Sequence, residues 1–158
     1  MGRASGGASR ALGGAGDGVA ATAAMSGIMY AAHRAGRLGR PPPATITDRA
    51  LHLLGRDDAS DEKKTALTWV AHLTFGASAG ALYAAPGRAP RSWGRAAVEG
   101  AAFGAAVWLV SYAGWVPALS ILPPPHRDRR GRPTSMLVSH LVFGAVLGLL
   151  GERRRRAP

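Results

Sequence analysis

The chain has 158 residues, 47% of them hydrophobic, and a formal net charge of +11 at pH 7. It contains no cysteine, which excludes disulfides, thiolate metal sites and cysteine nucleophiles. The charge alone would fit a nucleic-acid partner, but the arginines cluster at the ends of apolar stretches, where they meet anionic lipid headgroups instead. We therefore expect a lipid bilayer, and no nucleic acid, as the partner of this chain.

Four apolar stretches, taken in chain order, predict four membrane-spanning helices. They cover about residues 14–34, 65–85, 98–117 and 134–151. A helix needs about 20 residues to cross the roughly 30 Å hydrocarbon core, and the first stretch reaches that length only by including Asp17. After it, residues 46–55 predict a short surface helix capped by Thr45 or Thr47. Pro117 predicts that the third span ends or bends nearby.

The two halves of the chain match in an acid–glycine pair, a tyrosine, three consecutive prolines and a histidine. At an offset of 82 residues (99 − 17), Asp17-Gly18 pairs with Glu99-Gly100, Tyr30 with Tyr112, and residues 41–43 with residues 123–125. At an offset of 68 residues (140 − 72), His72 pairs with His140. This pattern predicts two tandem repeats, about residues 17–85 and 99–151, within a single domain that covers residues 1–158.

Each repeat contains two spans, so the second repeat enters the membrane in the same direction as the first. The expected fold is an all-α integral membrane four-helix bundle made of two tandem parallel helical hairpins, with both termini on one side of the membrane. Lysines and arginines are nearly balanced between the two sides, but the arginine run at residues 153–156 directly follows the last span and favours cytoplasmic termini.

The motif His-Leu-x-Phe-Gly-Ala-x-x-Gly occurs twice, at residues 72–80 and 140–148. Its spacing places each histidine and its two glycines on one helix face, where a second helix can approach closely. The candidate site, for packing or for function, combines these residues with the two acids of the repeat: His72, Gly76, Gly80, His140, Gly144, Gly148, Asp17 and Glu99. For the acids we favour a simpler explanation, that each stabilises a helix N-terminus through the helix macrodipole.

The paired histidines have three interpretations. In the favoured one, each imidazole forms a hydrogen bond to a neighbouring helix and fixes its register, with no cofactor involved. In the second, the pair forms a small proton or ion pathway, because an imidazole changes its charge near pH 6.5. In the third, the pair supplies the axial ligands of a haem. No triad, paired-carboxylate, zinc or phosphate-loop pattern supports an enzyme or a metal site.

Several segments carry a resemblance to known proteins: residues 25–27 (Met-Ser-Gly), 71–77 around His72, 107–119 with Trp-Val-Pro-Ala-Leu at its end, 123–128 (Pro-Pro-Pro-His-Arg-Asp) and 139–141 around His140. In them the chain resembles small, uncharacterised bacterial four-span membrane proteins, broadly similar to the YagU-type inner-membrane proteins. The resemblance implies a multi-pass protein of the bacterial inner membrane and supplies no reaction. We expect a non-enzymatic structural or envelope-stress role. Small-residue outer faces would also suit a homo-oligomer.

Overall fold

The computed structural model describes residues 2–87, 89 and 91–157, which form helices and loops without a strand. The helices are α1 (Gly2–Arg34), α2 (Pro42–Leu53), α3 (Asp61–Ala84), α4 (Trp93–Val110), α5 (Val116–Ala118) and α6 (Arg132–Arg156). A π-helical turn, Ser111–Trp115, links α4 to α5, and a 3₁₀ turn, Pro125–Arg127, precedes α6. The expected all-α class is confirmed for this part of the chain.

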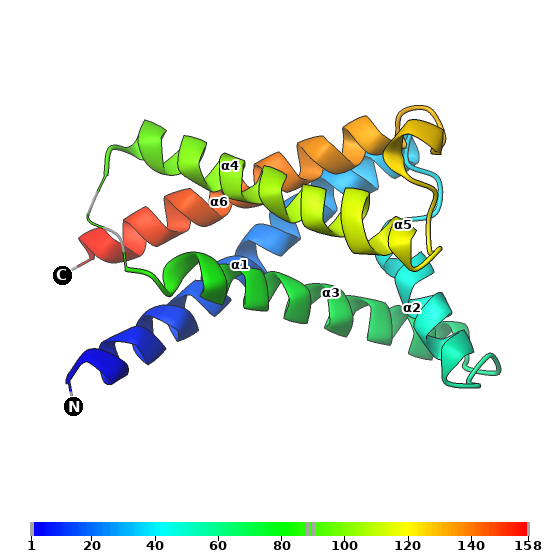
Figure 1. Cartoon of the computed structure of the whole chain (residues 1–158), viewed down its shortest axis with the longest axis horizontal. Coiled ribbons are helices and arrows are strands. Elements are labelled where there is room, and N and C mark those ends of the chain that lie inside the picture. Colours follow the sequence, from blue (N-terminus) through cyan, green and yellow to red (C-terminus); the bar gives the residue numbers. More distant parts are fainter. Residues whose placement is uncertain (1, 88, 90, 158) are drawn as a thin grey trace.

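The four long helices form two pairs. α1 packs against α3, α4 packs against α6, and contacts between α1 and α6 join the two pairs. α1 begins and α6 ends at the same end of the bundle, which we call the terminal end (Figure 1). α2, α5 and the loops beside them lie at the opposite end, which we call the loop end (Figure 1).

Local chemistry explains where several helices begin. The hydroxyl oxygens of Ser60 and Ser92 accept hydrogen bonds from the backbone nitrogens of Lys63 (3.4 Å) and Arg95 (3.3 Å), and so cap α3 and α4. The surface helix expected at residues 46–55 is present as α2, but it begins at Pro42 and no threonine caps it. Proline suits a first helical turn because its φ is already helical and its missing N–H would be unpaired there.

α1 begins well before the predicted start of the first span. Its 33 residues make a helix about 50 Å long, longer than the roughly 30 Å hydrocarbon core. Asp17 therefore lies about four turns inside α1, and Glu99 lies beyond the first turn of α4. Neither helix has an acid in its first turn, so the macrodipole explanation of these two acids is wrong.

The third predicted span widens into a π turn before Pro117 and ends just after this proline. Pro117 has no N–H to donate to the carbonyl of Ala113, and the chain forms the π turn over Ser111–Trp115 just before it. α5 then ends at Ala118, one residue after Pro117, as this proline predicts.

Within the described residues, two helices are long and apolar enough to cross a membrane: Trp93–Ala118, which joins α4, the π turn and α5, and Arg132–Arg156. In their most apolar 18-residue stretches only 28% and 44% of the residues are buried, whereas the core helix of a soluble protein is mostly buried. Large apolar side chains also face outward on α3, where Val70 is 62% and Leu82 is 66% exposed.

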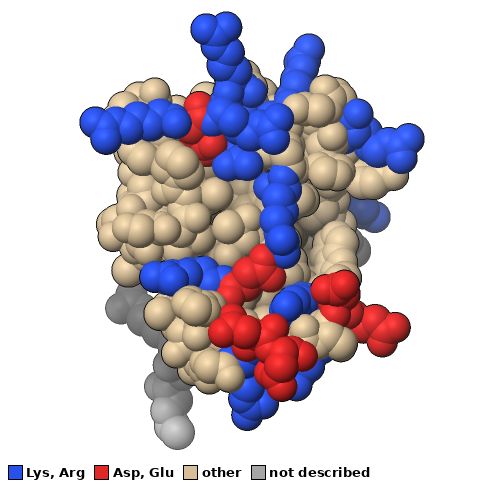
Figure 2. Space-filling view, turned by 90° about the vertical axis from the view of Figure 1, so that its right-hand side faces the viewer, with Lys and Arg blue, Asp and Glu red and all other residues tan. Residues whose placement is uncertain are grey.

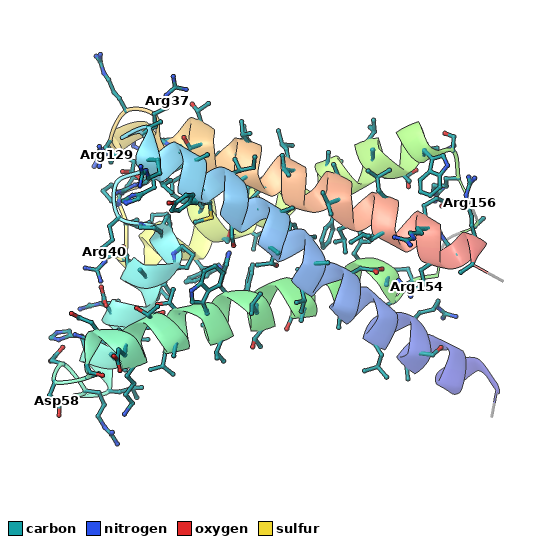
Figure 3. The ribbon with its side chains drawn as sticks, turned by 180° about the vertical axis from the view of Figure 1, so that it is seen from behind. Arg37, Arg40, Asp58, Arg129, Arg154 and Arg156 are labelled. Carbon is teal, nitrogen blue, oxygen red and sulfur yellow. The ribbon has the colours of Figure 1, made fainter. Side chains whose placement is uncertain are left out.

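Charged side chains gather at the two ends of the bundle. Arg37, Arg40, Asp58 and Arg129 lie at the loop end, and Arg154 and Arg156 lie at the terminal end (Figure 3). Figure 2, which faces the loop end, shows lysines and arginines spread over that surface, with most of the acidic atoms in its lower part, towards α2 and the start of α3, and a smaller acidic group among the basic side chains of its upper part.

Candidate functional site

The glycines of the motif bring the backbones of paired helices into direct contact. A Cβ atom built on one glycine of each contact would overlap a backbone carbonyl oxygen of the facing helix. Four of these contacts are Gly18 with Gly76, Gly80 with Gly14, Gly100 with Gly144, and Gly148 with Ala96, and a fifth is Gly104 with His140. We call the α1–α3 and α4–α6 contacts the two glycine seams; any larger residue in them would push the helices apart.

A cavity of about 240 Å³ lies between the two helix pairs. His72 of α3 and His140 of α6 both line it, and most of the remaining wall is apolar, including Met25 and Phe143. Phe75 also lines the cavity and is 44% exposed, so the cavity reaches the outer surface of α3. The structure thus brings the two histidines of the motif to one space, which we call the central cavity.

His140 is 5% exposed and forms a hydrogen bond within its own helix. Its Nδ1 atom lies 2.8 Å from the carbonyl oxygen of Met136, one turn earlier. Because a carbonyl oxygen can only accept, Nδ1 carries the proton and donates it. Nε2 is then the ring nitrogen left for a molecule in the central cavity.

His72 lines both the central cavity and a second cavity of about 390 Å³, which we call the loop-end cavity. Its wall includes Arg40, Asp48 and Lys64. Nε2 of His72 and Oγ of Ser26, both from residues of this wall, are buried without a hydrogen-bond partner among the described residues. Buried polar atoms are nearly always paired, so these two are exceptions among the described residues.

The favoured packing interpretation needs each imidazole to bond to a neighbouring helix. The hydrogen bond of His140 stays within α6, and the buried Nε2 of His72 has no partner in the described part of the chain. Neither of these atoms holds two helices together. The glycine seams, and not the rings, make the close contacts between helices.

Three hydroxyl groups belong to residues of the central cavity, and each donates its proton to another protein atom. The donors and acceptors are Thr22 Oγ1 to the Gly18 carbonyl (2.8 Å), Ser111 Oγ to the Val107 carbonyl (2.6 Å), and the Tyr112 hydroxyl to the Asp128 carboxylate. These oxygens can still accept a hydrogen bond, but they have no proton left to donate.

The π turn contributes Ser111, Tyr112 and Trp115 to the wall of the central cavity. A π turn changes the direction of the side chains that follow it, and such turns are frequent at functional sites. Tyr112 is fixed by Asp128, which also accepts a hydrogen bond from Arg132 at 2.9 Å. The role of Asp128 was not predictable from the sequence, because this residue stands in an irregular loop where no periodic pattern indicates a partner.

Aromatic and aliphatic side chains bound the central cavity towards the terminal end. The rings of Tyr83 on α3 and Phe103 on α4 have centroids 5.1 Å apart. Phe143 and Leu147 of α6 belong to the same core and are 3% and 1% exposed. The space between the helix pairs is therefore filled on this side.

Asp17 and Glu99 lie apart from the histidines and line neither cavity. Asp17 forms an ion pair with Arg154 at 2.9 Å, and Glu99 forms ion pairs with Arg91 at 2.8 Å and Arg95 at 2.9 Å. The eight candidate residues thus divide into the cavity and seam residues on one hand and two acids paired with arginines on the other.

The sequence analysis also missed Glu152, which is completely buried. Its carboxylate accepts hydrogen bonds from Arg155 (2.9 Å), Arg156 (2.7 Å) and the backbone nitrogen of Arg91 (3.1 Å). In the sequence it is one acid before an arginine run, and only the fold brings Arg91 to it from 61 residues away.

Among the described residues, no group of three or more histidine, aspartate or glutamate side chains could hold a metal ion. The haem interpretation would need the two imidazoles on opposite sides of one iron, and it stays a prediction.

A family model described as a family of unknown function, DUF6789, matches residues 8–158. That range contains both histidine motifs, both glycine seams and every residue of the two cavities. No curated protein and no solved structure matches the chain. The chain therefore belongs to the DUF6789 family.

Proposed function

We propose that this protein is a four-span integral protein of the bacterial inner membrane that binds a lipophilic molecule in the central cavity. One observation carries the binding proposal: His72 and His140, from different helix pairs, line a largely apolar cavity that reaches the outer surface beside Phe75. Ligand sites are typically apolar hollows with a few polar groups that fix orientation. A molecule dissolved in the hydrocarbon of the membrane could enter this one from the side.

The arrangement of α1 and α3 supports four spans instead of two. Both helices pack along the two apolar helices or along each other, and charged residues lie at both ends of the bundle (Figure 3). Val70 and Leu82 on α3 present apolar surface to the outside. In water such surface would be costly, and in lipid it is not.

The glycine seams support two tandem repeats. The Gly18–Gly76 contact corresponds to Gly100–Gly144 at the sequence offsets of 82 and 68 residues. The Gly80–Gly14 contact corresponds in the same way to Gly148–Ala96. We propose that the two hairpins are parallel copies and that both termini face the cytoplasm. The likeness to YagU-type proteins belongs to the same proposal.

Tryptophan fluorescence can test the binding proposal, because Trp115 lines the central cavity. The protein is placed in nanodiscs of phosphatidylethanolamine and phosphatidylglycerol and titrated with 4-bromoanisole, an apolar ring whose bromine quenches indole fluorescence. Saturable quenching is expected, and Val107→Phe, which enlarges a residue of the cavity wall, should abolish it. Val110→Phe is the matched control, since Val110 is 67% exposed on the same helix. If quenching rises linearly and equally in the native protein, Val107→Phe and Val110→Phe, the probe has only partitioned into the lipid and the binding proposal is rejected.

A second candidate is a proton or ion pathway, favoured by the position of His72 in the walls of both cavities. Charged residues of the loop-end cavity, His72 and His140 would form a series towards the middle of the bundle. The Tyr83–Phe103 contact would have to open for passage to the terminal end. Proton flux into liposomes, followed with an entrapped pH dye, should then fall in His72→Gln and His140→Gln. Equal flux in liposomes with and without the protein would end this candidate.

A further inference from the structure

Most hydroxyl and imidazole groups in the wall of the central cavity can accept a hydrogen bond but have no free proton to donate. The hydroxyl protons of Thr22, Ser111 and Tyr112 are all donated to other protein atoms, which leaves three acceptors. The bond from Nδ1 of His140 to the Met136 carbonyl fixes the position of its proton as well. In the neutral ring, Nε2 then carries a lone pair and no proton, and it is the strongest acceptor of the set.

The charge of the wall supports a neutral His140. No aspartate or glutamate is among the residues that line the central cavity, within the part of the chain that the structure describes. Asp128, the nearest acid in the bonding network, reaches the wall only through Tyr112 and is already paired with Arg132. An imidazolium without a counter-ion in an apolar space is costly.

We propose, building on ligand binding in this cavity, that the ligand is a lipophilic alcohol or phenol whose hydroxyl group donates a hydrogen bond to Nε2 of His140. A hydroxyl group supplies a proton to Nε2 of His140, which none of the three wall hydroxyl groups can do. Its oxygen can accept in return from His72 or from the indole N–H of Trp115, which also line the cavity.

Other polar groups fit this wall less well. A ketone, an ester or an ether brings only acceptors, and it would leave Nε2 of His140 buried without a donor. A carboxylate adds charge and acceptors together, and an ammonium group would find no acid among the wall residues described here. The cavity of about 240 Å³ is smaller than the roughly 300–1,000 Å³ of sites for drug-sized ligands. It therefore holds one ring or one headgroup, and an alkyl or prenyl tail would extend past Phe75 into lipid.

Two probes that differ in one group test this inference: 4-bromophenol, which donates, and 4-bromoanisole, which does not. Both are titrated against the full chain in the same nanodiscs by tryptophan quenching. We expect the phenol to bind about fivefold more tightly, the typical net value of one hydrogen bond. His140→Phe should remove this preference while anisole affinity is kept, and His126→Phe, at an exposed loop position, should keep it.

The outcomes separate the two levels of the proposal. Equal affinity for both probes in the native chain, or a preference that survives in His140→Phe, overturns the hydroxyl inference and leaves cavity binding intact. No saturable binding of either probe overturns the binding proposal itself. Should His140→Phe lose both probes, nitrogen NMR of histidine-labelled native protein decides. The His140 Nε2 resonance is expected to move with the phenol and not with the anisole, and a resonance that moves with neither rejects the inference.

Discussion

Asp17 and Arg154 form an ion pair at 2.9 Å although 137 residues separate them in the chain, and the pair ties the first long helix to the last. The Nε atom of Arg154 donates to the same carboxylate oxygen at 3.1 Å. The side chain of Asp17 is 15% exposed and that of Arg154 is 35% exposed, so the pair is partly shielded from water. Without Arg154, the carboxylate of Asp17 would lose its main hydrogen-bond and charge partner.

Asp17→Asn should therefore lower the free energy of unfolding by about 1–2 kcal/mol, between the values for exposed and fully buried ion pairs. Unfolding by dodecyl sulfate in mixed micelles, followed by circular dichroism, measures the change. Asp58→Asn, at an exposed position of the loop end, is the control and should have little effect. Strict additivity of Asp17→Asn and Arg154→Gln in a double-mutant cycle would show that the two side chains do not interact.

The glycine seams predict opposite effects for two Gly→Ala changes in the same helix. At Gly100 a new Cβ overlaps the Gly144 carbonyl, so Gly100→Ala should destabilise the protein by about 1–3 kcal/mol. At Gly94 a Cβ meets nothing within 4 Å, and Gly94→Ala should be neutral or stabilising by up to about 1 kcal/mol, because alanine favours the helix. The same unfolding assay applies.

The repeat extends this test to α1. Gly18→Ala, at the position equivalent to Gly100, should destabilise, and Gly27→Ala, where a Cβ also meets nothing within 4 Å, should not. A large effect at Gly100 with none at Gly18 would contradict equivalent seams in the two hairpins.

Two tyrosines at equivalent repeat positions should respond differently to loss of the hydroxyl group. Tyr112 is 2% exposed and donates to Asp128, whereas Tyr30 is 64% exposed. Tyr112→Phe should cost about 1–2 kcal/mol, because it removes a hydrogen bond to a carboxylate, and Tyr30→Phe should cost almost nothing. Melting curves of the two variants in detergent make the comparison. Equal melting temperatures would mean that Asp128 does not hold the π turn.

The number of spans can be measured because the chain has no cysteine of its own. Single cysteines at the exposed positions of Asp58, Arg130 and Ala157 are labelled with an impermeant maleimide in right-side-out and inverted vesicles. With four spans, Asp58→Cys and Arg130→Cys label from one side and Ala157→Cys from the other. With only the two most apolar helices in the membrane, Asp58→Cys would label together with Ala157→Cys.

The sequence predicted the features that depend on local pattern. Apolar stretches of sufficient length predicted the four long helices, and most of the predicted ends lie within about five residues of the observed ones. The repeated motif singled out His72 and His140, which line one cavity. The predicted start of α1 was wrong. The first turns of this helix are rich in Ala and Gly and carry no strong apolar signal, although alanine favours a helix.

Contacts between distant polar residues were not predictable in the same way. An acid such as Asp17, Asp128 or Glu152 has many arginines within reach in the sequence, and nothing in its neighbours says which one the fold brings to it. The direction of the hydroxyl protons in the cavity also depends on three-dimensional contacts: Thr22 and Ser111 donate to backbone carbonyls one turn away, and Tyr112 donates to Asp128. The chemical preference of the cavity could therefore be read only from three-dimensional contacts.

The π turn at Ser111–Trp115 is a place where inserting or deleting one residue would change the shape of the cavity wall. A π turn holds one residue more than an α-helical turn of the same rise. Deleting Ala113 would convert this turn into a regular α-helical turn of the same rise, with the glycines of α4 still in their seam. The residues of the turn that line the cavity, Ser111, Tyr112 and Trp115, would then be repositioned relative to one another. Insertions and deletions in this turn are thus a simple genetic route by which one bundle could exchange one ligand pocket for another without repacking its helices.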